Sequence, residues 1–251
     1  MAQLFAGTSG FAYPGWKPRF YPEKLPAKKF LDYYSSRLNA VEINYTFRRL
    51  PAVSTLTGWV ESTRPGFVFA PKAHMRITHI LKLKDAAEFA GVFLKAIDPL
   101  RTARRLGPIL FQLPPTLRCD LALLSDFLSH LPEDLRYTFE FRHVSWLAEP
   151  TYKLLADHKI ALCAAESEKL ETPEVITANF IYYRLRKPEY SPEDRKEIAA
   201  AADRILGSGK DVFLFFKHED TPEGALYAEE ILSGAGFDPA GRFSTGPLAA
   251  E

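Results

Sequence analysis

The sequence has little cysteine and no excess of charge of either sign. Only two of its 251 residues are cysteines, Cys119 and Cys163, and they lie too far apart to match the spacing of a metal site. We therefore expect free thiols in a reducing compartment. The 32 Lys and Arg residues nearly balance the 31 Asp and Glu residues, so the formal net charge is +1. This balance argues against duplex nucleic acid and anionic membrane surfaces as partners.

Long apolar runs and a secretion signal are also lacking. No stretch approaches the roughly 18 consecutive apolar residues that a membrane-spanning helix needs. The N-terminal segment, MAQLFAGTSG, has no basic region followed by a long apolar one. The sequence contains no G-x-S-x-G, Walker or dinucleotide-binding motif, and we expect no cofactor. These features predict a cytoplasmic protein without a membrane partner, and they leave its oligomeric state open.

Short runs rich in β-branched and aromatic residues alternate with longer segments of helical periodicity. This alternation predicts βαβ units and a parallel sheet. The expected strands are 4–9, 40–44, 67–72, 108–113, 137–142, 160–165, 180–185 and 212–217. The expected helices are 27–37, 52–62, 85–106, 120–130, 145–158, 192–206 and 222–233. Segment 166–179 is a poor helix candidate, because Pro173 interrupts it and its periodicity is weak.

Eight strands favour a closed barrel of TIM type over an open doubly wound sheet. Such barrels commonly have about 250 residues. The open sheet usually has a Gly-rich turn after its first strand, and a long aromatic loop, FAYPGWKPRFYPEKLP, stands there instead. We therefore predict an α/β protein with a single eight-stranded β/α barrel over residues 1–251. The Gly-, Pro- and Ala-rich end, 237–251, is expected to form a surface tail.

Charged residues recur at alternate positions of several expected strands. Glu140 and Arg142 share one face of their strand, and Glu42 shares a face with Asn44. Because a charge beneath a helix would be desolvated without a partner, these faces should point into the barrel. The matching positions of other strands are also polar and lie toward the C-terminal ends. The expected pocket contains Glu42, Asn44, Lys72, Gln112, Glu140, Arg142, Arg184 and Lys217.

Such a pocket is either a ligand site or a structural layer of ion pairs that only fills space. Its size and its location at one end favour a site. The candidate catalytic residues are Glu140, Glu42 and Lys72, and the candidate substrate-binding residues are Arg142, Arg184, Lys217, Asn44, Gln112, His79, Tyr13 and Trp16. The aromatic residues of the first loop either stack on a ligand or form a small core of that loop.

A metal site built from Glu42, Glu140 and a histidine such as His79 is a further alternative. The sequence has no close ligand pair such as H-x-H, and we therefore predict no metal. We expect Glu140 to be ionised, because Arg142 on the same face outweighs the effect of burial. We also expect Arg142→Ala and Arg184→Ala to lose ligand binding without unfolding the barrel.

Several long motifs run in order through nearly the whole chain. They include GTSGFAYPGW (7–16), YYSSRLNAVEINYTFRRLP (33–51), LGPILFQLPP (106–115), FEFRHVSW (139–146) and FLFFKHEDTPEGALYAEEI (213–231). Together they resemble the domain of unknown function 72 family, the YecE-like proteins. The resemblance implies a TIM-type barrel but no established reaction. Many members have His-Gly after the seventh strand and Asn-Asn after the eighth. Arg186-Lys187 and Lys217-His218 stand there in this chain, which implies a more cationic mouth.

These patterns predict an enzyme that acts on a small anionic molecule bearing a phosphate or a carboxylate. The cations would neutralise the anion, and Glu140 or Glu42 would act as general acid or base. This chemistry fits a cofactor-independent hydrolase, lyase or isomerase. Lys72 could instead form an imine, but we rank this lower because the two carboxylates would restore its charge. The alternative is a non-catalytic protein that binds a ligand or single-stranded nucleic acid through the aromatic loop.

Overall fold

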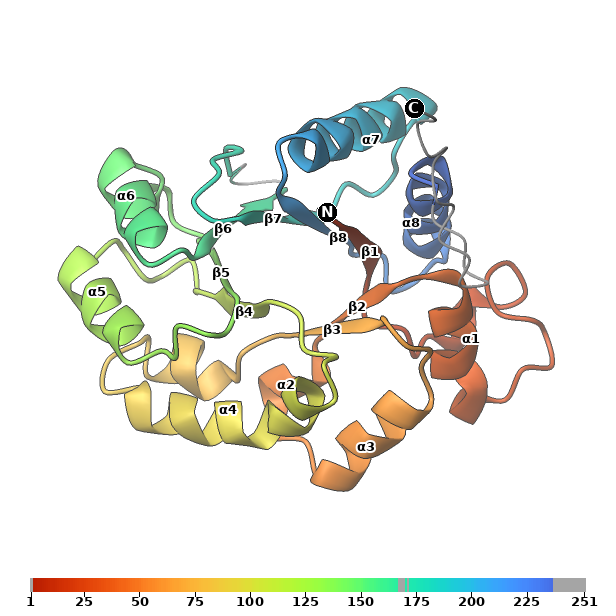
Figure 1. Cartoon of the computed structure of the whole chain (residues 1–251), viewed down its shortest axis with the longest axis horizontal. Helices are drawn as coiled ribbons and strands as arrows, with labels where there is room; N and C mark the ends of the chain where they lie inside the picture. The colour runs from red at the N-terminus through yellow and green to blue at the C-terminus, as the bar shows by residue number, and fades with distance from the viewer. Residues whose placement is uncertain (1, 167–169, 171, 237–251) are drawn as a thin grey trace, which may run out of the picture.

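A parallel sheet of eight strands forms the centre of the computed structural model, which describes residues 2–166, 170 and 172–236 (Figure 1). The strands are β1 (Leu4–Ser9), β2 (Ala40–Ile43), β3 (Val68–Pro71), β4 (Ile109–Gln112), β5 (Tyr137–Glu140), β6 (Ala161–Ala165), β7 (Phe180–Leu185) and β8 (Asp211–Phe216). They pair in the order β3-β2-β1-β8-β7-β6-β5-β4. Each strand therefore lies beside its neighbours in sequence, and β1 pairs with β8.

The sheet is closed into a barrel between β3 and β4. Phe69 pairs with Leu106 and Lys72 pairs with Leu110 in isolated parallel bridges. The amide of Ala73 also donates to the carbonyl oxygen of Leu110 at 2.9 Å. The predicted β/α barrel is confirmed, and the open doubly wound sheet is wrong for this chain.

Helices surround the strands, as Figure 1 shows. They are α1 (Phe30–Arg37), α2 (Tyr45–Arg48), α3 (Val53–Glu61), α4 (Ala87–Thr102), α5 (Leu121–Ser129), α6 (Glu149–Asp157), α7 (Pro192–Gly207) and α8 (Glu223–Gly234). The single turn α2 and a π-helical turn at Arg76–Ile80 were not predicted. None of the described residues between β6 and β7 is helical, which agrees with the weak periodicity there. The expected tail, 237–251, lies outside the described residues.

Strand parity decides which side chains enter the barrel. On β5, Phe139 faces outward and stacks on Phe111 at a centroid distance of 5.0 Å, within the core beneath the helices. Thr138 and Glu140 alternate with it and therefore face the interior, where both are buried. The outward positions are apolar because helices cover them, so the polar positions of the strands are directed into the barrel.

Five of the predicted strands end one or two residues earlier than expected, and cations follow three of them. Lys72, Arg142 and Lys217 lie just beyond β3, β5 and β8, so they are the first residues of loops rather than the last residues of strands. Loops at the C-terminal ends of parallel strands form the mouth of a TIM-type barrel. These cations therefore lie where such barrels usually place ligands.

Candidate active site at the mouth of the barrel

Arg184 lies between two carboxylates inside the barrel. Its Nη2 donates to Glu42 Oε1 at 2.6 Å, and its Nη1 donates to Glu140 Oε2 at 2.5 Å. The three side chains come from β7, β2 and β5, and Glu42 is 0%, Arg184 1% and Glu140 2% exposed. We call these three residues the buried floor. Removing one partner of such a buried pair is costly, so the floor ties three strands together.

Glu42 accepts two further hydrogen bonds. The Ser9 hydroxyl donates to Oε1 at 2.7 Å, and the Tyr182 hydroxyl donates to Oε2 at 2.8 Å. Burial raises the pKa of Glu42, but Arg184 and these hydroxyls outweigh burial and hold the pKa below its usual value. Ser9 and Tyr182 were not predicted. Tyr182 shares its strand face with Arg184, and this parity could have identified it.

Glu140 is surrounded by donors. Arg142 Nε lies 3.0 Å from Oε1, Arg186 Nη2 lies 3.2 Å from Oε1, and Gln112 Nε2 lies 2.8 Å from Oε2. Burial raises the pKa of Glu140, but the three arginines outweigh burial, led by Arg184, and the pKa is lowered. The carboxylate is therefore ionised, as its pairing with Arg142 predicted. A carboxylate so fully occupied and so acidic is poorly suited to proton transfer near neutral pH.

Lys72 is linked to Glu140 through the side chain of one residue, Gln112. Its Nζ donates to Gln112 Oε1 at 2.8 Å, while Gln112 Nε2 donates to Glu140. Because a carboxylate can only accept, the Gln112 amide is held with its oxygen toward Lys72. The Nζ also lies 3.9 Å from the centroid of the Phe47 ring. Burial and the nearby Arg184 lower the pKa of Lys72 to about 7, against the opposing pull of two carboxylates.

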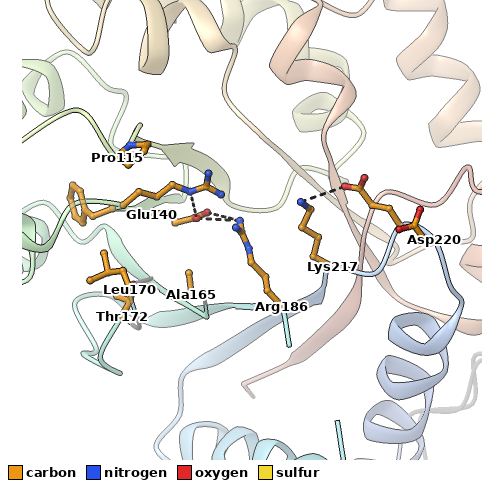
Figure 2. A pocket seen from close by; sticks show the side chains of 11 residues that line it. Pro115, Glu140, Ala165, Leu170, Thr172, Arg186, Lys217 and Asp220 are labelled. Atoms are coloured by element: carbon orange, nitrogen blue, oxygen red, sulfur yellow. Dashed lines mark hydrogen bonds and ion pairs between the residues drawn. The ribbon is translucent and has the colours of Figure 1, made fainter. Parts of the chain in front are cut away.

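A cavity of about 530 Å³ opens beside the floor, at the C-terminal ends of β5 to β8 (Figure 2). It is lined by Pro115, Glu140, Phe141, Arg142, Ala165, Leu170, Thr172, Arg186, Lys217, Glu219 and Asp220. We call Arg142, Arg186 and Lys217 the cationic rim, because their side chains are 34%, 14% and 40% exposed. Figure 2 shows Arg186 and Lys217 entering the cavity from just beyond the ends of β7 and β8. The rim thus offers positive charge that solvent and ligands can reach, next to the carboxylates of Glu219 and Asp220 that line the same cavity.

The structure joins six of the predicted pocket residues in one hydrogen-bonded network. They are Glu42, Lys72, Gln112, Glu140, Arg142 and Arg184. Only two members of this network, Glu140 and Arg142, line the cavity. Lys217 lines the cavity as well but has only Glu219, at 3.7 Å, as an ion-pair partner among the described residues. Arg186, which was not chosen as a site residue, joins the network through Glu140.

Arg184 is a correction to the predicted site. Strand parity predicts it as an anion-binding residue, but its guanidinium is buried and its charge is already matched by Glu42 and Glu140. A ligand anion would have to compete with two carboxylates in a site that water does not reach. Arg184 therefore fits the alternative of a structural ion-pair layer, and the same holds for Glu42.

Three other predicted residues lie near the mouth. The Tyr13 hydroxyl donates to the carbonyl oxygen of Ser9 at 2.9 Å. Asn44 directly precedes α2, and its side chain makes no hydrogen bond in the described part of the chain. His79 packs edge-on against Phe47 at a centroid distance of 5.0 Å. Burial, Lys72 and Arg142 lower the pKa of His79, so its ring is neutral near neutral pH.

Trp16 is a second correction. Its side chain is 0% exposed and packs against Tyr13, Phe20 and Tyr21 at centroid distances of 4.9, 5.7 and 5.9 Å. The first loop therefore has a small aromatic core, and Trp16 belongs to it rather than to a ligand surface. This packing also removes buried rings that the nucleic-acid alternative needed for stacking on bases.

Neither a metal cluster nor a membrane helix is present in residues 2–166, 170 and 172–236. No group of three or more His, Cys, Asp or Glu side chains in these ranges could hold a metal ion. None of the helices in them is long and apolar enough to cross a membrane. Cys119 and Cys163 are free thiols, and burial raises the pKa of Cys163.

Fold and site together define a TIM-type barrel with a charged cavity at the C-terminal ends of its strands. The model of the family described as "Protein of unknown function DUF72" matches residues 5–243, and the chain belongs to this family. The resemblance in the sequence motifs is confirmed.

Two curated proteins related to this chain in sequence both carry the name UPF0759. The chain is 27% identical to the UPF0759 protein YunF of Bacillus subtilis (strain 168) over 157 residues, which cover 60% of this chain and 54% of that protein. It is 33% identical to the UPF0759 protein YecE of Escherichia coli (strain K12) over 120 residues, which cover 47% of this chain and 43% of that protein. The matches span about half the length of these curated relatives.

Solved structures of similar fold include family members and an enzyme. A DUF72 family protein from Thermotoga maritima MSB8 has a TM-score of 0.83 and 27% identity, over 93% of this chain and 99% of that chain. An AP endonuclease of family 2 from Brucella melitensis has a TM-score of 0.52 and 10% identity, over 94% of this chain and 98% of that chain. At this identity the second likeness concerns the barrel fold alone.

Proposed function

We propose that this protein is an enzyme that binds a small phosphate- or carboxylate-bearing molecule in the cavity at the mouth. The supporting observation is the excess of guanidiniums over carboxylates in the network at Glu140, since Glu219 and Asp220 balance the charge of the cavity lining as a whole. The two carboxylates of the floor contact three guanidiniums, and two of these, Arg142 and Arg186, line the cavity. In the described part of the chain, Arg142 contacts Glu140 only through Nε. Its two Nη groups fit a bidentate contact to an anion.

The proposed chemistry is acid/base catalysis through Lys72 rather than through Glu140. Glu140 stays ionised because its pKa is lowered, whereas the pKa of Lys72, about 7, allows the amine to gain and lose a proton near neutral pH. An acid/base group works best when its pKa lies near the working pH. Glu140 then has a positioning role, because it orients Arg142, Arg186 and Gln112. A hydrolase, lyase or isomerase reaction of this type needs no redox cofactor.

Calorimetric titration with inorganic phosphate and with malonate tests anion binding. Arg142→Ala removes a rim guanidinium, and we expect phosphate affinity to fall about tenfold. Arg136→Ala is a matched control. Arg136 precedes the same strand at its other end, and its pair with Asp211 has a similar exposure, 42% for Arg136 against 34% for Arg142. The control should bind as the unchanged protein does. Equal affinity in both variants, or no binding of either probe to the unchanged chain, would refute the anion site.

A further inference from the structure

Among the described residues, no negative charge lies at hydrogen-bond distance from the buried amine of Lys72. Lys72 is 8% exposed, and its Nζ makes one hydrogen bond among the described residues, to the neutral oxygen of Gln112. An ammonium group has three N–H donors, and the described side chains around Lys72 offer a hydrogen-bond acceptor to one of them. Burying a charge with so few partners is costly, and releasing the proton relieves that cost. The site therefore favours a neutral amine.

The charge on this amine depends on groups from five elements and from the loop after β5. Arg184 of β7 and Arg142 after β5 repel the ammonium, whereas Glu42 of β2 and Glu140 of β5 attract it. His79, in the π-helical turn after β3, lies close enough for its own pKa to be lowered by Lys72. The face of the Phe47 ring of α2 favours the charged form. Both carboxylates are already held by Arg184, so their attraction for Lys72 is weakened.

We propose that the Lys72 amine forms an imine with the carbonyl group of an anionic aldehyde or ketone held in the cavity. The amine nitrogen adds to the carbonyl carbon, and the carbonyl oxygen leaves as water with the two amine hydrogens. The products are one imine and one water, and no oxidant or reductant takes part. This proposal rests on the proposed function, because the cationic rim holds the anionic group while the amine reacts. It narrows the substrate class to phosphorylated or carboxylated carbonyl compounds.

Gln112 and Glu140 lie between the Lys72 amine and the cavity, which Lys72 itself does not line. Lys72 Nζ is linked to the cavity wall through a single residue, because Gln112 bridges it to Glu140, and Arg142 contacts the same carboxylate. Imine formation therefore requires the Gln112 side chain to turn aside, so that the carbonyl carbon of a short molecule can reach the amine while its phosphate remains at Arg142. Phe47, which is half-buried, covers the other side of the amine. Its ring keeps water away from the nitrogen and limits the access of large molecules.

Reductive trapping tests this proposal. The full chain is incubated near neutral pH with sodium cyanoborohydride and either glyceraldehyde 3-phosphate or glyceraldehyde, and labelled lysines are mapped by peptide mass spectrometry. Lys153, whose side chain is 71% exposed, is the internal control. We expect the phosphorylated probe to label Lys72 at least about tenfold faster than Lys153, because the pKa of Lys72, about 7, leaves much of its amine unprotonated near neutral pH. Labelling of Lys72 should rise with pH and level off just above its pKa of about 7.

Two variants, Phe47→Ala and Arg142→Ala, define results that would contradict the proposal. Phe47→Ala uncovers the amine and should speed labelling further. If Lys72 reacts no faster than Lys153 in the unchanged chain, or reacts only in Phe47→Ala, the native site does not support imine formation and the proposal is wrong. Arg142→Ala should slow labelling by the phosphorylated probe while leaving labelling by glyceraldehyde unchanged.

Calorimetry and trapping together distinguish a failure of imine formation from a failure of anion binding. If calorimetry shows phosphate binding but Lys72 is not labelled, imine formation fails and the proposed function stands. If both aldehydes label Lys72 at the same rate and Arg142→Ala changes neither rate, the imine stands and the anion site fails. A fold check by circular dichroism and thermal midpoint for each variant ensures that a lost label reflects chemistry rather than unfolding.

Discussion

Arg184 and Arg142 donate hydrogen bonds to the same carboxylate, that of Glu140, yet their surroundings differ. Within the described residues, Arg184 is 1% exposed and contacts two carboxylates, whereas the side chain of Arg142 is 34% exposed and contacts one. A buried charge that loses its partner strongly destabilises a protein, while a partly exposed pair contributes little to stability. Burial thus separates the structural charges of the floor from the charges of the rim, which a ligand can reach.

Substitution of Arg184 should cause the largest loss in the free energy of unfolding. Arg184→Met keeps most of the side-chain volume but leaves Glu42 and Glu140 buried without their shared counter-ion. We expect the free energy of unfolding in urea to fall by about 3–5 kcal/mol. Adding Glu42→Gln to Arg184→Met should restore part of the loss, because one unpaired charge is then removed. Unchanged stability in the single variant would place Arg184 in the rim. This expectation reverses the one drawn from strand parity, that Arg184→Ala leaves the barrel intact.

Acid should weaken the floor before it affects the rim. The pKa values of Glu42 and Glu140 are lowered in the folded chain, so these groups bind protons less readily than they do when unfolded. Their stabilising effect is complete above the unfolded pKa, about 4.3, and is lost as the pH falls below it. We expect the free energy of unfolding to drop by about 2 kcal/mol between about pH 5 and pH 3. Glu140→Gln should be less stable at neutral pH and lose less on acidification. Parallel pH curves for the two proteins would contradict this.

Arg186 is intermediate in exposure between the floor and the exposed residues of the rim, so its substitution tests whether it stabilises the fold or binds the anion. Its side chain is 14% exposed, its contacts to Glu140 are long at 3.2 and 3.4 Å, and its Nε is buried without an acceptor among the described residues. We expect Arg186→Ala to lose only about 1 kcal/mol of unfolding free energy. Phosphate affinity, measured by calorimetry, should fall about tenfold, because this guanidinium lines the cavity. A loss of stability as large as that of Arg184→Met would assign Arg186 to the floor.

Strand parity predicted which residues face the barrel, but it could not predict their depth. Glu42, Gln112, Glu140 and Arg184 face inward because the alternate positions are apolar and covered by helices. Arg184 and Arg186 share that parity, yet one belongs to the floor and the other to the rim. Depth depends on the height of each strand end and on the surrounding loops, and these are tertiary features. A pattern with a period of two contains no information about them.

The partners of the site were harder to predict than its charges. Ser9 and Tyr182 donate to Glu42, but a serine at the end of a strand and a tyrosine within an apolar strand are equally typical of ordinary core positions. Trp16 shows the opposite error. An aromatic residue in a loop near the mouth suggests a ligand surface, and only three-dimensional packing shows that it fills the loop's own core. Loop conformation has no periodicity from which a burial pattern could be inferred.

Lys217 should show the smallest effects, because it is the most exposed cation of the rim. Its side chain is 40% exposed, and its ion-pair partner Glu219 lies 3.7 Å away. We expect Lys217→Ala to change the free energy of unfolding by less than about 0.5 kcal/mol. Phosphate affinity should fall about threefold at low salt, and the difference should shrink as added salt screens the charge. Lys153→Ala, which removes another exposed lysine, is the control and should bind phosphate as the unchanged chain does.

The salt dependence decides what Lys217 contributes. A solvated ammonium attracts an anion mainly through long-range electrostatics, which salt screens, whereas a direct contact in a closed cavity is screened much less. If the affinity difference for Lys217→Ala persists at high salt, Lys217 contacts the anion directly, as is proposed for Arg142. If the difference disappears, Lys217 attracts ligands from a distance, and binding itself rests on the two guanidiniums that Glu140 orients.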